Sequence, residues 1–236
     1  MNKKYIKGLL VFSAIIALCV NCMGENNSQE ELIKRAGAPL LSGLGEHSFE
    51  ITTADSGAQK YFDQGLVLAF AFNHAESIRS FQAAQRLDPE CAMCFWGEAL
   101  SRGPNINVTS DGKVVMSNDD RVKAFVSLNK AKNLSSGVSI KEQDYIEALS
   151  NRYNGDISTN RNALDLQYAK AMESLSQKYP NDMDAASLFA ESLMNTMPWN
   201  YWAEDGNPRP DTVKVISALE YVLNESPNHP LAIHLY

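Results

Sequence analysis

The sequence has few of the residues on which recognisable catalytic and metal motifs depend. Its 236 residues include only four cysteines, four histidines and three tryptophans, and 21 basic residues face 28 acidic ones, giving a net charge of −7. This acidic balance excludes nucleic acid and an anionic membrane surface as first-choice partners. There is no G-x-S-x-G, G-x-x-x-x-G-K or H-E-x-x-H, and Gly43-Leu-Gly45 lacks the third glycine of a dinucleotide fingerprint. No motif names a reaction, so we expect a binding protein rather than an enzyme.

Long apolar runs are scarce as well, and the single one lies at the N-terminus. Three lysines precede an uncharged run that ends at Val20 and is too short to span a bilayer comfortably. Residues 1–22 are therefore expected to be an export signal. Cys22 stands where a lipoprotein signal carries its lipidated cysteine, although the residues before it fit that signal weakly. We expect lipidation at Cys22, a tether over residues 23–47, and a protein that is periplasmic or held at the membrane through this lipid alone.

The rest of the chain has the composition of a globular domain, with 44% hydrophobic and 21% charged residues. From Ser56 onward, apolar residues recur every three or four positions, which predicts an all-α domain over residues 48–236. Ser56 and Gln59 form a capping-box pattern before the first helix, and Asn73 precedes a second helix.

Helix-closing signals repeat along this domain. They fall at Pro89, near Ser135, at Pro180 and at Pro227, in steps of about 47, 44 and 47 residues, although a minimal two-helix repeat needs only about 34. The extra residues lie between the two helices of a pair each time, and insertions at one point of a repeat emerge on one edge of the stack. We call this the insertion edge. Its loops comprise residues 103–118, 151–160 and 197–208.

Cap patterns also mark the starts of later pairs. Ser139 with Glu142 predicts the start of the third pair, and Asn181 with Asp184 predicts that of the fourth.

The repeating unit resembles the tetratricopeptide repeat (TPR) at Tyr61, Gly65, Phe81, Ala84 and Pro89. Over residues 48–236 the chain is similar to a group of exported bacterial TPR proteins without a settled activity. This resemblance implies a TPR-like α-solenoid with a concave groove. The motifs that carry it are Tyr61–Gly65, Asn73-His74, Leu87–Pro89, Cys91–Gly97, Gly103–Asn105, Pro198-Trp199 and Asn228–Pro230.

The chain stops soon after a fifth pair begins, since residues 230–236 supply only about two helical turns. Members of the group typically continue with further helix pairs. We therefore expect the repeat domain to be incomplete at its C-terminal end, the alternative being that a partner or second copy covers that end.

Cys91 and Cys94 form the sharpest local motif, a C-x-x-C. A haem attachment site is excluded because Phe95, not histidine, follows. Three readings remain: a structural disulfide or buried thiols, part of a transition-metal site, or a redox pair.

The insertion edge offers the better candidates for binding, because aromatic and amide side chains suit a peptide or a small polar ligand. In the alternative reading, the tryptophans only roof over helix ends and His74 is a surface residue at a helix start. The candidate binding residues are His74, Asn105, Asn107, Arg152, Tyr153, Trp199, Tyr201 and Trp202.

Two functions follow as hypotheses. The first is an extracytoplasmic scaffold that binds a protein or peptide partner and needs no cofactor. The alternative is a metal-binding or metal-dependent envelope protein that uses Cys91, Cys94 and histidines. Helix spacing places His229 about three units from His74, on the opposite edge, so one site that combines them with Cys91 is not expected.

Overall fold

The computed structural model describes residues 28–108 and 115–236. The expected export signal and Cys22 lie outside these residues. The chain divides into two compact units, Met1–Leu40 and Leu41–Tyr236. In the first unit, residues 28–36 form a helix within the stretch expected to be a tether.

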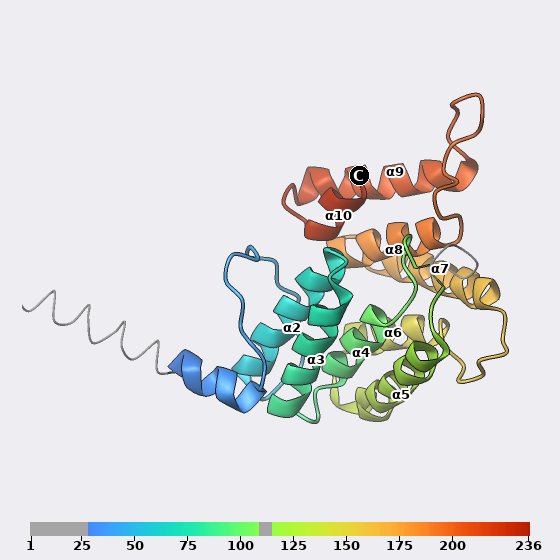
Figure 1. The fold of residues 1–236 in the computed structure, drawn as a ribbon. Helices are drawn as coiled ribbons and strands as arrows, with labels where there is room; N and C mark the ends of the chain where they lie inside the picture. Colours follow the sequence, from blue (N-terminus) through green and yellow to red (C-terminus); the bar gives the residue numbers. More distant parts are fainter. Residues whose placement is uncertain (1–27, 109–114) are drawn as a thin grey trace, which may run out of the picture. The chain divides into compact units, whose positions relative to one another are not determined.

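The second unit carries an all-α array of helices joined by loops (Figure 1). No helix of the described residues is both long and apolar enough to cross a membrane. The helices are α2 (Ser56–Phe70), α3 (His74–Leu87), α4 (Ala92–Ser101), α5 (Asn118–Leu134), α6 (Ile140–Ser150), α7 (Arg161–Lys178), α8 (Met183–Asn195), α9 (Pro210–Glu225) and α10 (Pro230–Leu235), with a short 3₁₀ helix η1 (Ser135–Gly137).

Each of these helices packs against the next one along the chain, as an array of helical hairpins requires. The first helices of neighbouring pairs also touch, because α2 contacts α4 and α4 contacts α6. The three long connections follow α4, α6 and α8, so the prediction that insertions separate the two helices of a pair is confirmed.

The first two pairs interlock around one aromatic ring. Phe81 of α3 is fully buried, and its ring lies against Gly65 of α2 and Gly97 of α4. A Cβ atom added at Gly97 would lie 2.2 Å from the ring. Glycine at this position is therefore what allows α4 to approach α3 so closely.

Helix starts follow local side-chain chemistry. The capping box of Ser139 and Glu142 before α6 is confirmed, with both of its hydrogen bonds formed. The capping box expected at Ser56 and Gln59 is wrong. Asp55 caps α2 instead, because its carboxylate already accepts the Gly57 backbone N–H, and the Gln59 side chain bonds to the preceding segment.

The array does not remain open along its inner helices. Most residues of α2 and almost all of those of α4 and α8 are buried, so these helices are covered by side-chain packing and do not present the concave groove that we expected. The last helix also returns to the first, since α10 contacts α2 as well as α8 and α9. The placement of His229 about three units from His74 is therefore wrong, since its ring lies 5.8 Å from that of Phe70 at the end of α2.

Candidate functional site

The insertion edge is held together by hydrogen bonds between segments far apart in sequence. The Trp199 indole N–H donates to the Ile106 carbonyl oxygen at 2.8 Å, which joins the third insertion to the first. Arg152, from the second insertion, donates to the Pro104 carbonyl oxygen at 2.8 Å. The three insertions thus form one connected surface.

His74 lies at the start of α3, and its Nε2 is 2.8 Å from the Asn105 side-chain amide. Burial lowers its pKa, and the positive charge of Arg152 lowers it further, against an opposing contact with the Ser101 carbonyl. The imidazole is therefore neutral near pH 7, which suits a hydrogen-bonding role. Asn105 in turn accepts the backbone N–H groups of Asn107 and Val108, which fixes the loop.

Charged groups lie buried beneath this loop. The guanidinium of Arg152 is 1% exposed, stacks on the Tyr168 ring at 4.6 Å and lies 3.5 Å from the Asp165 carboxylate. Glu191 of α8 is also buried, and burial raises the pKa of its carboxyl despite the nearby charge of Arg152. Buried ionisable groups with shifted pKa values tend to cluster at functional sites.

A small pocket separates these groups, and we call it the edge cavity. Its volume of about 20 Å³ holds about one water molecule. Two of the residues that line it have a buried nitrogen without a hydrogen-bond partner: Nδ1 of His74 and Nε of Arg152. The residues that line the cavity include Phe70, Phe72, His74, Arg152, Glu191 and Leu231.

Two aromatic residues at this edge have strained backbones. Within residues 28–108 and 115–236, Phe72 and Trp199 are the only non-glycine residues with positive φ, at 58° and 59°. Such a conformation costs about 1–2 kcal/mol for a residue with a Cβ atom. Phe72 stacks on His74 with 5.6 Å between ring centroids, whereas Trp199 is 71% exposed. An exposed, strained tryptophan contributes little to the core.

The predicted residues do not all play one part. His74 and Arg152 line the edge cavity, Asn105 contacts His74 there, and Tyr201 lies close to Glu191.

The other predicted residues lie apart from the cavity wall. Trp202 is 54% exposed and Asn107 is also exposed, whereas Tyr153 is buried and donates to the Ala99 carbonyl oxygen. Sequence reasoning missed Phe72 and Glu191. The signal for Glu191 was a lone acid in an otherwise apolar stretch.

Cys91 and Cys94 are joined by a disulfide bond and are fully buried at the start of α4. The Cys91 sulfur also accepts the Cys94 backbone N–H. A disulfide has no thiolate to offer a metal ion, so the bonded pair acts as a covalent cap for this helix.

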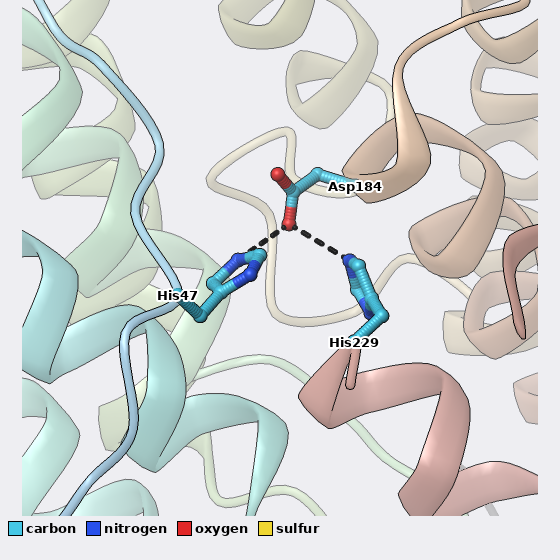
Figure 2. A group of neighbouring side chains, drawn as sticks. All are labelled: His47, Asp184 and His229. Carbon is cyan, nitrogen blue, oxygen red and sulfur yellow. Dashed lines mark hydrogen bonds and ion pairs between the residues drawn. The ribbon is translucent and has the colours of Figure 1, made fainter. Parts of the chain in front are cut away.

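A second polar cluster, which we call the His–Asp–His cluster, consists of His47, Asp184 and His229 (Figure 2). One carboxylate oxygen of Asp184 lies 3.0 Å from Nε2 of His47 and 3.3 Å from Nε2 of His229. The sequence had suggested that Asn181, together with Asp184, caps α8. That is wrong, because Asp182 caps α8 and leaves Asp184 to face the two histidines.

No family model, curated protein or solved structure matches this chain. The case for a function therefore depends on the residues of the chain itself.

Proposed function

We propose that the chain is an exported TPR-like binding protein whose insertion edge takes a protein or peptide partner. Helices that pack sequentially in hairpins support the repeat reading, as do Gly65 and Phe81, which meet where TPR helices pack. The basic and then apolar N-terminus supports export, and Cys22 is the proposed lipid anchor.

The observation that carries this proposal is Trp199. It combines high exposure, a left-handed backbone and a hydrogen bond that holds its indole against the neighbouring insertion. Strain that contributes no burial is expected where a side chain must be presented to a ligand. Tryptophan is also the residue type most enriched among the dominant contacts of protein interfaces.

The size of the edge cavity favours a macromolecular partner over an enclosed small molecule. Drug-sized ligands occupy pockets of about 300–1,000 Å³, whereas this cavity measures about 20 Å³. A peptide or protein laid across Trp199 and Trp202 can place one polar group at its mouth. The neutral His74 and the charged Arg152 would meet that group there.

The test is site-specific photo-crosslinking in the cells that make the protein. A benzophenone amino acid replaces Trp202 in one variant and Val126, on α5, in the control. Val126 is a suitable match because it is 61% exposed, against 54% for Trp202.

We expect a discrete crosslinked product from position 202 and none from position 126. The product should disappear when Trp199→Ala is added. Equal labelling at both positions, or none at 202, would contradict binding at the insertion edge. If native mass spectrometry finds a small retained ligand, that result contradicts only the claim that the partner is a macromolecule.

Export and lipidation need a separate measurement, the intact mass of the native protein from membrane and soluble fractions. A mass that lacks residues before Cys22 and carries added lipid supports both. A chain that retains its first residues contradicts them.

A further inference from the structure

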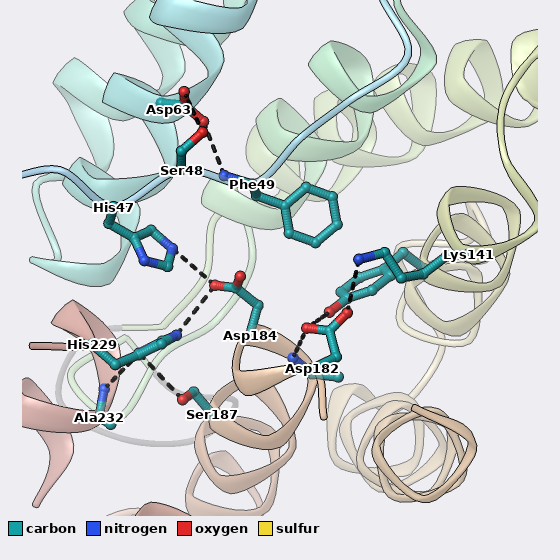
Figure 3. A network of polar contacts seen from close by, with 12 residues as sticks. His47, Ser48, Phe49, Asp63, Lys141, Asp182, Asp184, Ser187, His229 and Ala232 are labelled. Carbon is teal, nitrogen blue, oxygen red and sulfur yellow. Dashed lines mark hydrogen bonds and ion pairs between the residues drawn. The ribbon is translucent and has the colours of Figure 1, made fainter. Parts of the chain in front are cut away.

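Three segments that are far apart in sequence converge on the carboxylate of Asp184. His47 lies in the loop before α2, Asp184 lies in the first turn of α8, and His229 is the residue that caps α10 (Figure 3). The ligand atoms of the three side chains all lie within 4.8 Å of one another. The imidazole rings of the two histidines meet edge to face, with 4.9 Å between centroids.

This spacing is close to that of metal ligands. With metal–ligand bonds of about 2.0–2.2 Å, two ligands of a tetrahedral ion lie about 3.4 Å apart. The two nitrogen–oxygen distances here are 3.0 and 3.3 Å and the whole set lies within 4.8 Å, so the ligands must shift by up to about 1.4 Å to surround an ion. Two imidazoles and one carboxylate are a common donor set for Zn²⁺ and Fe²⁺ in proteins.

The surroundings are suitable for a cation. Asp63 lies near His47 and accepts the Ser48 hydroxyl and the Phe49 backbone N–H, and Asp182, the residue that caps α8, precedes Asp184 by two positions (Figure 3). Lys141 also belongs to this network, and its charge is paired with Asp182 at 3.2 Å.

Access is provided by an open cleft of about 470 Å³ whose lining includes Asp184. Neither histidine lines this cleft and the Asp184 side chain is 12% exposed, so an ion held by the cluster would take its remaining ligands from water on the Asp184 side.

His229 must change its tautomer to act as a ligand through Nε2. Its Nδ1 now accepts the Ala232 backbone N–H at 3.3 Å, which places the proton on Nε2, facing Asp184. On metal binding that proton leaves Nε2, and Nδ1 becomes the protonated nitrogen. Nδ1 has an alternative partner in the Ser187 hydroxyl oxygen, also at 3.3 Å. The cost is one long capping hydrogen bond.

We propose that His47, Asp184 and His229 bind one divalent transition-metal ion, through Nε2 of each histidine and a carboxylate oxygen of Asp184. This site is distinct from the insertion edge and uses neither Cys91 nor Cys94. The alternative is a purely structural cluster, which we call the structural pin, in which the two histidines only donate hydrogen bonds to the buried carboxylate and no ion binds.

The experiment uses the full chain with its disulfide intact, stripped of metal by a chelator and titrated with ZnCl₂ in a calorimeter. Visible absorption after addition of Co²⁺ then reports the donor atoms. The test variants are His47→Gln and Asp184→Asn. His234→Gln is the matched control, because His234 contacts Phe70, as His47 and His229 do, but lies outside the cluster. His47 is in a loop and caps no helix, so its replacement should leave the fold intact, as circular dichroism can verify.

We expect one Zn²⁺ per chain in the wild type and in His234→Gln, at least tenfold weaker binding in His47→Gln, and weaker binding in Asp184→Asn. Zn²⁺ should also raise the melting temperature of the wild type and not of His47→Gln. Absence of stoichiometric binding, or equal binding in His47→Gln, overturns the site. A His47→Gln variant that loses stability while the wild type binds no Zn²⁺ identifies the structural pin instead.

Discussion

A single methyl group at Gly97 should destabilise the protein substantially. Its Cβ atom would lie 2.2 Å from Cε1 of Phe81 and 2.5 Å from Cδ1 and Cζ, against a normal carbon–carbon contact of about 3.5–4.0 Å. The ring has little room to move, because Gly65 lies against it and the Phe62 ring packs at 5.4 Å. Overpacking of this severity costs about 3 kcal/mol, and alanine returns about 1 kcal/mol through helix propensity. We therefore expect Gly97→Ala to lower the free energy of unfolding by about 2 kcal/mol.

Urea unfolding of four proteins tests this reasoning: the wild type, Gly97→Ala, Phe81→Leu and the double variant. Leucine lacks the Cε1 and Cζ atoms with which the new methyl group collides. In that background, Gly97→Ala should cost at least about 1 kcal/mol less than in the wild type, which is the coupling expected of residues in contact. An equal cost in both backgrounds, or a Gly97→Ala protein more stable than the wild type, would refute the account of how α3 and α4 pack.

Three further outcomes follow from the described residues. The free energy of unfolding of Trp199→Gly should exceed that of Trp199→Ala by about 1 kcal/mol, because of the two only glycine adopts a positive φ without strain. Equal stability of the two variants in urea would show that the backbone is unstrained. Because burial lowers the pKa of His74, the unfolded chain takes up its proton at about pH 6.5 and the folded chain only below that. Stability is thus lost as pH falls through about 6.5 toward the lower pKa of the folded chain, and the wild type should lose more of it than His74→Gln. Parallel pH profiles would contradict this. The Cys91–Cys94 disulfide closes only a short loop, so its reduction should lower the free energy of unfolding by only about 2 kcal/mol. A reduced protein that is fully unfolded in buffer would be inconsistent with a local cap.

Local features were predictable from the sequence wherever one interaction dominates. The start of α6 is an example, because the Ser139 hydroxyl accepts the Glu142 backbone N–H and the Glu142 carboxylate accepts the Ser139 backbone N–H, all within one turn. The positions of the three insertions were predictable for a similar reason, since glycine, proline and polar residues interrupt the helical period there. The start of α2 was not, because Asp55 competes with Ser56 for the same free N–H groups and the pattern alone does not rank them.

The candidate sites were predictable only in part. Residues on the loops could be assigned to one edge from the repeat, and His74, Asn105 and Arg152 do meet there. The His–Asp–His cluster could not be assigned, because His47 and Asp184 are 137 residues apart and their contact depends on how far the array curls. A curl of that kind accumulates from small angles at every helix interface, which no sequence motif records.

The contact between α10 and α2 changes how this domain should lose its structure. In an open array each unit touches only its neighbours, and end units can fray one at a time. Here His234 lies 2.6 Å from the carbonyl oxygen of Phe70 across 164 residues, and its ring lies 4.4 Å from that of Phe72. Melting of either end hairpin uncovers the face of the other, so the two ends should open together and exchange their amide hydrogens at similar rates. The domain should then behave as one cooperative unit, whose folding waits on its most distant contact.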